Sequence, residues 1–302
     1  MSIEPSPRWA RAGWLRRAAA LCVLAATAAA AQSLAPAPAD SAAALRERHA
    51  ALQEALRSNA FGRAVHLDSV QNSGDLRGDI HAVLEHPFET VSARLSQPAV
   101  WCEVMILHLN VKQCRLDAAA ASPQLTLHVG RKYDQPLEEA YRVDFTYRVT
   151  AATPDHLHVG LRADVGPLGT RDYRIAVRAV PLPGGQTFLH LSYAYGYGMA
   201  ARMAMQAYLA TVGSAKIGFT VLERRADAAP LYIGGVRGVV ERNTMRYFLA
   251  IDAYLASLAL PAPQQLERRL HDWFAATERY APQLHEMNEA DYVAMKHKEI
   301  GR

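Results

Sequence analysis

The strongest constraint on the fold is a run of alternating apolar side chains between residues 125 and 195. In five successive segments every second side chain is apolar, and mainly polar side chains stand between them. The alternating apolar positions are Leu125, Leu127 and Val129; Tyr141, Val143, Phe145, Tyr147 and Val149; Leu157, Val159 and Leu161; Tyr173, Ile175 and Val177; and Leu189, Leu191, Tyr193 and Tyr195. Turn-forming sequences such as "DQP", "TPD" and "PLPGG" separate the segments. Because successive side chains of a strand point to opposite faces, the pattern predicts an antiparallel meander with one apolar and one solvated face.

An apolar sheet face must be covered, and the longest amphipathic helix candidate, residues 234–258, is suited to cover it. Plotted at about 100° per residue, one side of this helix collects the following side chains: Val236, Val240, Asn243, Tyr247, Ala250, Ile251 and Tyr254. We expect that side to face the sheet. Glu241 is then expected on the opposite side, where Arg237 four residues earlier would pair with it.

Shorter helices are predicted before and after the sheet region. They comprise a surface-lying helix within 40–59, two short helices within 87–105 separated by Pro98, and one helix each at 199–213 and 264–279. The chain beyond Pro282 is expected to be weakly ordered.

The first 31 residues have the pattern of a secretory signal peptide. Basic residues, the last of them Arg17, precede an uncharged run at 18–30, and small residues follow. A transmembrane helix needs about 20 apolar residues, so this run is too short to span a bilayer comfortably. We expect cleavage after Ala31, loss of Cys22 with the peptide, and a periplasmic protein.

The mature chain would then keep two cysteines, Cys102 and Cys114. In an oxidising compartment such a pair is most simply a disulfide, since a metal site would need further ligands nearby. Twelve residues of continuous strand would separate the α-carbons by about 40 Å, whereas a disulfide needs about 4.4 to 6.8 Å. The chain must therefore reverse, and we expect a helix over "PAVWCEVMILH", a turn near Asn110 and a strand over "VKQCRL". A structural role is expected rather than a redox role.

Loss of the signal peptide also changes the charge. Four arginines and one glutamate leave with residues 1–31, so 29 basic and 28 acidic side chains remain, a net charge of about +1. This balance removes the electrostatic argument for nucleic-acid binding. His156 and His158 would share the solvated face of a strand, and no full set of metal ligands is evident around them, so neither a metal nor a cofactor is predicted. No nucleophile signature occurs, and no catalytic residue is assigned.

From about residue 64 to 258, phrases such as "GDIHAVLEHPFETVSARL" and the order of elements resemble the START-like superfamily, also called SRPBCC, of the polyketide cyclase and lipid-transport group. The resemblance implies an α+β fold in which a curved antiparallel sheet grips a long C-terminal helix, here with extra N- and C-terminal helices and in an exported branch. It also implies a cavity between helix and sheet for sterols, lipids or other apolar ligands, with catalysis in some branches. The expected organisation is a signal peptide at 1–31, a linker and N-terminal helix at 32–60, a helix-grip domain at 61–260 and a C-terminal helical extension at 261–302.

Candidate ligand-binding residues are polar groups that the pattern places around this cavity. An unpaired amide at Asn243, within the apolar stripe, would cost about 1 to 3 kcal/mol, so it needs a backbone group, a tyrosine or a ligand head as its partner. Arg246 flanks the stripe and would reach a carboxylate or phosphate at the cavity mouth, or a surface ion pair. The tyrosines among the candidates, with apolar bodies and hydroxyl ends, are Tyr147, Tyr193, Tyr195 and Tyr247.

These features lead to three hypotheses. The first is an exported binding or carrier protein for an apolar or amphipathic, lipid-like small molecule, with transient membrane contact as a further expectation and no partner protein inferable. The second is a cyclase- or isomerase-type enzyme on the same scaffold, which would require a buried acid or base. The third is a structural or interaction protein with a filled core.

Overall fold

A computed structural model describes residues 40–120, 122–199, 202–203, 205–206, 211, 216–224 and 229–301. The predicted signal peptide, its cleavage site after Ala31 and most of the predicted helix at 199–213 lie outside the described residues.

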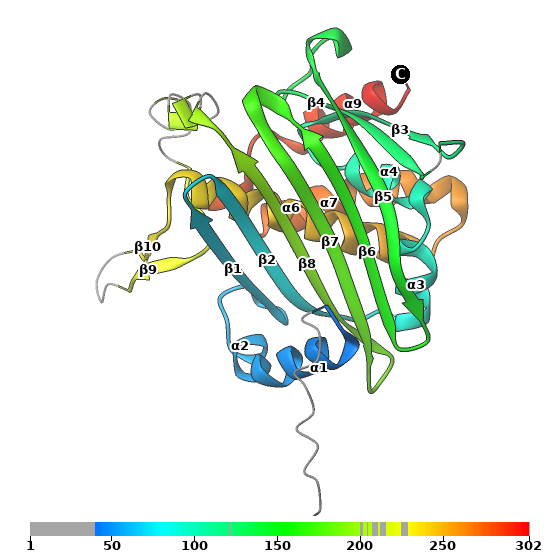
Figure 1. The fold of residues 1–302 in the computed structure, drawn as a ribbon. Coiled ribbons are helices and arrows are strands. Elements are labelled where there is room, and N and C mark those ends of the chain that lie inside the picture. The colour runs from blue at the N-terminus through cyan, green and yellow to red at the C-terminus, as the bar shows by residue number, and fades with distance from the viewer. Residues whose placement is uncertain are drawn as a thin grey trace, which may run out of the picture. The chain divides into compact units, whose positions relative to one another are not determined.

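The centre of the fold is an eight-stranded antiparallel sheet with the strand order β1-β2-β8-β7-β6-β5-β4-β3 (Figure 1). Its strands are β1 (Val65–Asn72), β2 (Asp75–Leu84), β3 (Val111–Asp117), β4 (Gln124–Val129), β5 (Tyr141–Thr153), β6 (His156–Val165), β7 (Thr170–Leu182) and β8 (Gln186–Tyr197). After β2 the chain crosses to the far edge of the sheet through α3 (Phe88–Leu95) and α4 (Pro98–Met105). The meander from β3 to β8 then returns until β8 pairs with β2.

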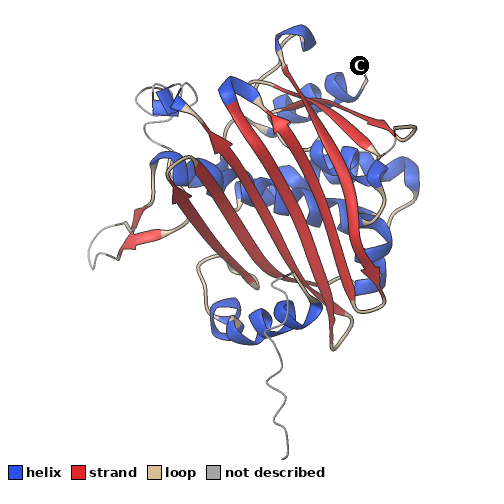
Figure 2. Cartoon of the chain, in the orientation of Figure 1, coloured by secondary structure: helices blue, strands red, loops and turns tan. Residues whose placement is uncertain are grey.

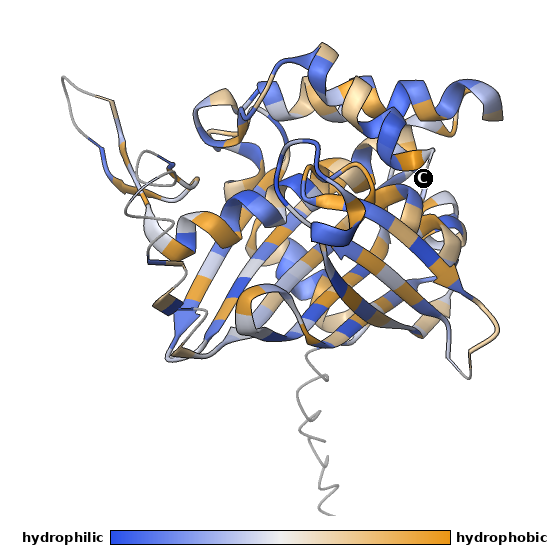
Figure 3. Cartoon of the chain, turned by 90° about the horizontal axis from the view of Figure 1, so that it is seen from above, coloured by the Kyte–Doolittle hydropathy of each residue, from blue (hydrophilic) through white to orange (hydrophobic). Residues whose placement is uncertain are grey.

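The predicted meander is confirmed, and its five alternating segments are β4 to β8. Leu127, Val159 and Leu191 are among the alternate residues buried on the inner face, and Figure 3 shows the colours of apolar and polar residues alternating along the strands. Tyr141 and Val149 are exceptions, at 48% and 38% exposure.

The hairpin of β1 and β2 was not among the predicted elements. Its residues pair from Val65 with Ala82 to Asn72 with Asp75, around a turn in which Gly74 has φ 126°. Polar side chains such as Ser69 and Asp79 are buried in these two strands, so the apolar alternation that revealed the other strands is interrupted here.

The long helix α6 (Gly235–Ser257) packs across β1, β2 and β8, as the predicted helix-grip arrangement requires. Figure 2 shows it behind the sheet together with α7 (Ala262–Glu278). At the crossing point with β2, a β-carbon on Gly78 would overlap the Thr244 hydroxyl. The small residue therefore allows a close approach of helix and strand.

The expected orientation of Glu241 is wrong. Its carboxylate is fully buried and accepts hydrogen bonds from Ser69 Oγ and Thr220 Oγ1, both at 2.6 Å, and from two backbone amides at 2.6 and 2.9 Å. Arg237 instead donates to the Ser69 carbonyl oxygen at 2.9 Å. The prediction assumed a solvated side of α6, but the sheet covers one side and residues 217–220, α7 and α8 (Ala281–Leu284) cover others. Because α6 is buried on nearly all sides, its polar side chains are not confined to one solvent-facing side.

The outer face of the sheet is not wholly solvated, which corrects the expectation of one wet face. Helices α1 (Ala42–Ala51) and α2 (Gln53–Arg57) lie at the lower end of the sheet in Figure 1. They form a second apolar cluster with strand residues, consisting of Leu45, Leu52, Leu56, Val180 and Phe188. Phe188 occupies an even position in β8 and is fully buried by this contact.

The C-terminal residues are ordered, contrary to the expectation for the chain beyond Pro282. Helix α9 (Glu289–Ile300) begins at Asn288, whose side chain accepts a hydrogen bond from the Asp291 amide at 2.9 Å. Tyr292 stacks on Trp273 with ring centroids 4.9 Å apart and donates to the Leu107 carbonyl at 2.9 Å. The apolar and capping contacts stabilise this helix, and α7 to α9 belong to the same compact unit as the sheet.

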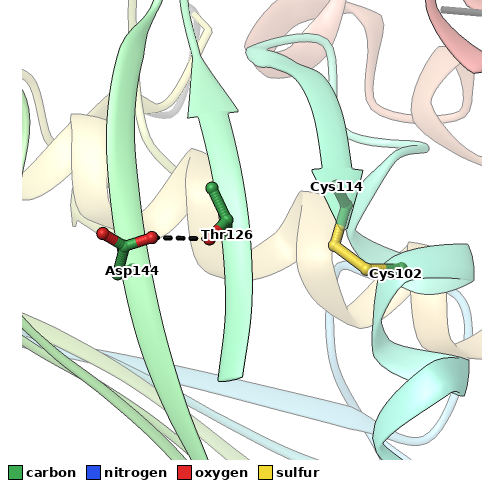
Figure 4. The surroundings of a disulfide bond; sticks show 4 residues. All are labelled: Cys102, Cys114, Thr126 and Asp144. Carbon is green, nitrogen blue, oxygen red and sulfur yellow. Dashed lines mark hydrogen bonds between the residues drawn. A yellow bond between two sulfur atoms is a disulfide. The ribbon is translucent and has the colours of Figure 1, made fainter. Parts of the chain in front are cut away.

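The predicted disulfide between Cys102 and Cys114 is present, with α-carbons 5.2 Å apart. Figure 4 shows that it joins α4 to β3, so the predicted helix, turn and returning strand are confirmed. On the neighbouring strands, the Thr126 hydroxyl donates to Asp144 at 2.6 Å. Among the described residues, no helix combines the length and apolar character that crossing a membrane requires.

Candidate functional site

A pocket of about 1020 Å³ opens beside the N-terminal half of α6. The helix contributes Val239, Arg242, Asn243 and Arg246 to its wall. The opposite walls come from loops at the ends of strands and from the C-terminal part of the chain, with the lining residues Asn110, Arg131, Lys132, Tyr133, Asp134, Leu168, Lys216, Glu286, Met287, Asp291, Ala294, Met295 and Lys298. The volume is in the range of small-molecule sites.

The position of this pocket differs from the one implied by the family resemblance. None of its described lining residues lies within a strand, so the concave face of the sheet is not its wall. That face is filled instead by side chains of α3, α4 and α6, for example Trp101, Val104 and Phe248, each at most 1% exposed. The pocket lies where strand ends, α6 and α9 meet.

One part of the lining is apolar. Val239 from α6 and Met287, Ala294 and Met295 from the C-terminal region supply aliphatic surface. Leu168, at 58% exposure, stands in the short 3₁₀ turn Pro167–Gly169 with φ 56°. A branched side chain rarely adopts a positive φ, so this conformation is held by its surroundings.

The other part of the lining is an ionic cluster centred on Glu286. Its carboxylate contacts Lys132 Nζ at 2.5 Å, Arg246 Nη2 at 2.9 Å and Lys216 Nζ at 3.3 Å. These cations come from the loop after β4, from α6 and from the segment before β9 (Val221–Glu223). Arg246 is 1% exposed and also donates to the Leu284 carbonyl at 3.2 Å. We call Glu286, Lys132, Lys216 and Arg246 the pocket cluster.

Burial and neighbouring charges set the protonation of this cluster. Burial and then the Arg246 charge lower the pKa of Lys132 to about 8, and Glu286 opposes this shift. Burial alone would raise the pKa of Glu286, but the charges of Lys132 and Arg246 outweigh it and hold the pKa below its usual value. At neutral pH the carboxylate is therefore ionised, and Lys132 is still mainly protonated.

Behind the pocket wall lies a buried imidazole, His108. Its Nδ1 accepts a hydrogen bond from the Asn110 amide at 3.1 Å, and the Asn243 side chain faces the ring. Burial, followed by the charges of Arg246 and Lys296, holds the pKa of His108 well below its ordinary value. Because Nδ1 is an acceptor, the neutral ring carries its proton on Nε2.

The predicted ligand-binding residues fall into three places. Asn243 and Arg246 lie together in the pocket wall. The Tyr247 ring lies 4.7 Å from the His108 ring and 5.3 Å from the Tyr193 ring, measured between centroids. The Tyr193 and Tyr195 rings are 5.6 Å apart. The three tyrosines therefore form an aromatic cluster, and none of them lines the pocket. Burial raises the pKa of each of these tyrosines.

Tyr147 lies elsewhere. Its hydroxyl donates to the Leu95 carbonyl oxygen at 3.1 Å, and the Trp101 indole donates to the same oxygen at 2.9 Å. Both side chains donate to a carbonyl oxygen at the last turn of α3 that would otherwise lack a hydrogen-bond partner. Tyr147 therefore has a structural role. The role of the other candidates in ligand binding stays a prediction.

Sequence analysis did not identify Lys132, Lys216 or Glu286. They stand outside regular elements, so no periodicity marks them, and 154 residues separate Lys132 from Glu286. The charged sequence "RKYD" at 131–134, directly after a strand, is the only local signal that could have drawn attention to the pocket.

No protein-family model matches the sequence, and no curated protein matches it either. Among solved structures, the fold is similar to that of a START superfamily protein from Mycobacterium smegmatis, with 14% identity over 44% of this chain and 91% of that chain and a TM-score of 0.31. Human StAR-related lipid transfer protein 5 is similar at 11% identity over 56% of this chain and 89% of that chain, with a TM-score of 0.31. Truncated norcoclaurine synthase from Thalictrum flavum is similar at 11% identity over 46% of this chain and 86% of that chain, with a TM-score of 0.33.

At these identities the similarity concerns the fold alone. The strand order and the placement of α6 across β1, β2 and β8 define an α+β protein with a helix-grip fold. This is the α+β helix-grip arrangement that the sequence predicts.

Proposed function

We propose that this chain is an exported binding or carrier protein that holds an apolar or amphipathic, lipid-like small molecule in the pocket beside α6. The observation that supports this most is a pocket of about 1020 Å³ whose wall combines aliphatic side chains with a few convergent polar groups. Preformed sites for small molecules have this composition.

Binding would be driven by burial of the apolar part of the ligand against Val239, Met287 and Met295. Removing about 250 Å² of apolar surface from water contributes roughly 6 kcal/mol before the entropic costs of association. The polar groups of the opposite wall would then orient the ligand head without having to supply most of the affinity.

Export is part of the same proposal. It is supported by the charge and hydropathy pattern of residues 1–31 and by the disulfide, which persists in oxidising compartments. Expression of the full chain in a bacterial host, followed by fractionation and N-terminal sequencing, tests it. We expect periplasmic protein that begins at Gln32, and full-length protein in the cytoplasm would contradict export.

Transient membrane contact is supported by exposed apolar side chains at the pocket rim. Tyr133 and Leu168 are 57% and 58% exposed, and both line the pocket. Such residues would let the pocket mouth meet a lipid surface when ligand is exchanged.

Mass spectrometry of organic extracts from natively purified protein tests the binding function. We expect a co-purifying small molecule with the wild type, and its loss in Ala294→Trp, because Ala294 is exposed at the pocket and a tryptophan there would occupy the ligand volume. Ala275→Trp is the matched control, since Ala275 is exposed in α7 but does not line the pocket. Repeated absence of any ligand from the wild type, or equal recovery from both variants, would contradict the proposal.

The alternative, a cyclase- or isomerase-type enzyme, is supported by one observation. His108 is a buried, oriented imidazole directly behind Asn110 and Asn243 of the pocket wall. If it acts as an acid or base, the co-purified molecule will be converted on prolonged incubation, and His108→Gln will stop the conversion while ligand is still recovered. The buried Glu241 has both oxygens occupied by hydrogen bonds and is a structural anchor, and a pocket of this size disfavours the filled-core hypothesis.

A further inference from the structure

The pocket cluster draws three cations from separate parts of the chain to one carboxylate. Lys132, Lys216 and Arg246 all contact Glu286 within 3.3 Å. A surface ion pair gains little energy because water screens it, but here the Arg246 side chain is 1% exposed and Glu286 12% exposed. Concentrating like charges in a partly dehydrated place is unfavourable unless anionic groups compensate for it.

Cationic side chains also outnumber carboxylates two to one in the described pocket lining. The cations are Arg131, Lys132, Lys216, Arg242, Arg246 and Lys298, and the carboxylates are Asp134, Glu286 and Asp291. Two of these carboxylates have partners away from the pocket cluster. Lys298 pairs with Asp134, and Asp291 accepts a hydrogen bond from Asn288 at 2.7 Å.

The position of Glu286 in the chain suits a replaceable partner. It stands in the segment between α8 and α9, outside both helices, and its neighbour His285 is exposed. By contrast, Arg246 is fixed in the middle of α6 and is held by the Leu284 carbonyl. Arg246 is therefore the helix-borne member of the pocket cluster, whereas Glu286, like Lys132 and Lys216, stands in a segment outside the helices and strands.

The apolar and ionic parts of the lining belong to one pocket. Met287 follows Glu286 directly, and Val239 stands about two helical turns before Arg246 on α6. A molecule with an aliphatic chain along Val239 and Met287 would thus present its head to Lys132, Lys216 and Arg246.

We propose that the ligand of this pocket is an amphiphile with an anionic head, a carboxylate or a phosphate, which binds the cations Lys132, Lys216 and Arg246 in competition with the resident carboxylate of Glu286. This inference rests on the proposed binding function and specifies its ligand class. Charge-assisted hydrogen bonds to lysine and arginine hold the head, and arginine presents a fork that matches both carboxylate and phosphate. Glu286 compensates the cations while the pocket is empty.

Competition between Glu286 and the ligand head predicts the direction in which each charge variant changes the affinity for the ligand. Glu286→Gln removes the competing charge and keeps the shape of the side chain, so the affinity for an anionic amphiphile should rise about fivefold to tenfold. Lys132→Gln and Lys216→Gln should each lower it by roughly the same factor. Glu47→Gln and Arg57→Gln, at exposed positions in α1 and α2 away from the pocket, are the matched controls and should change nothing.

Isothermal titration of the full mature chain with four probes provides the test. The probes are dodecanoate, dodecyl phosphate, 1-dodecanol and inorganic phosphate. We expect the two anionic amphiphiles to bind at least about tenfold more tightly than dodecanol, and only their affinities to respond to the charge variants. Thermal unfolding of each variant verifies that it is folded, and the two lysine variants test the proposal independently of Glu286→Gln.

The outcomes separate this inference from the function on which it rests. If dodecanol binds as tightly as dodecanoate, the pocket binds apolar molecules but the anionic head is wrong. If Glu286→Gln weakens the binding of both anionic amphiphiles, Glu286 organises the cations instead of competing, and the proposal is overturned. If inorganic phosphate binds as tightly as dodecyl phosphate, the site serves a free anion and not an amphiphile. If none of the probes binds, the binding function fails together with the inference.

Discussion

Two ionic clusters of this protein have nearly the same composition and very different surroundings. The pocket cluster places three cations around Glu286 beside a cavity of about 1020 Å³. The second, which we call the core triad, consists of Lys112, Lys296 and Glu299. In the core triad the ammonium groups of Lys112 and Lys296 contact opposite oxygens of Glu299 at 2.8 and 2.7 Å, and no member is more than 1% exposed.

The core triad is saturated with partners. Lys296 Nζ donates to the carbonyl oxygens of His108 and Val111, both at 2.9 Å, in addition to Glu299. Lys112 Nζ donates to the Leu109 carbonyl at 3.0 Å and contacts Met295 Sδ at 3.6 Å. Each ammonium group thus has at least three partners for its three protons, and these contacts attach α9 to β3 and to the turn before it.

The comparison shows that residue chemistry alone does not decide the role of a lysine–glutamate cluster. A saturated, dry cluster holds chain segments together, whereas a similar cluster that borders a cavity can exchange its partner. Solvent access and the number of filled donor sites make the difference, and both depend on the tertiary structure.

The largest expected difference between the clusters is in stability. Glu299→Gln would leave two buried ammonium groups without a counter-charge, and we expect it to lower the free energy of unfolding by about 3 to 5 kcal/mol. Glu286→Gln removes a carboxylate that borders the pocket and leaves cations that the pocket partly solvates, so it should cost clearly less than Glu299→Gln. Urea unfolding of both variants measures the difference, and equal losses would show that the two clusters do not differ as the comparison claims.

A covalent connection to β3 offers a second contrast. The disulfide joins α4 to the same strand that the core triad joins to α9. Replacing Cys102 and Cys114 by alanine should lower the free energy of unfolding by about 2 to 3 kcal/mol, because a short loop is no longer closed in the unfolded chain. Dodecanoate affinity should stay unchanged, since neither cysteine lines the pocket. If the double variant instead lost as much dodecanoate affinity as is expected for Lys132→Gln, the disulfide region and the pocket would be coupled. That result would contradict the independence of the two regions.

The smallest expected effect is a pH dependence confined to the pocket cluster. Because burial and the Arg246 charge lower the pKa of Lys132 to about 8, this side chain is cationic below that pH and neutral above it. The affinity for dodecanoate should therefore fall about threefold to tenfold between pH 7 and pH 9, while Glu286 and Arg246 keep their charges. Titration calorimetry over this range measures the change.

Lys132→Arg sharpens that test, since an arginine stays protonated throughout. Its affinity for dodecanoate should be nearly constant from pH 7 to pH 9. A decline equal to that of the wild type would show that another group titrates and that Lys132 does not hold the ligand head.

Several elements could be predicted because their signal is local. The strands β4 to β8 follow from period-two alternation and α6 from an uninterrupted helical segment, and the disulfide follows from the lone pair of cysteines that an exported mature chain would keep. The β1–β2 hairpin and the burial of Glu241 could not be predicted in this way. Ser69 and Glu241 are polar residues in the interior that satisfy each other, so they break the rule that polar residues mark the solvated face.

Of the candidate residues, Asn243 and Arg246 line the pocket, and both lie on α6, which was predicted at residues 234–258. The alternation along the strands correctly predicts that the side chains of Tyr147, Tyr193 and Tyr195 point into the interior. Alternation identifies the buried face of a sheet, but it does not show whether side chains fill the space above that face or leave a cavity. The volume left between packed side chains depends on every neighbour at once.

The sequence by itself determined the secondary structure of the meander, the long helix across it and the covalent connection of Cys102 to Cys114, because each depends on chain geometry over a few residues. The tertiary structure alone decided that the cavity lies at the strand ends and that Lys132 meets Glu286 across 154 positions. It also decided that Glu299 is sealed in the interior while Glu286 borders the cavity. The physical reason is that burial, and with it the strength and exchangeability of an ionic contact, is a property of the packed whole and not of any segment.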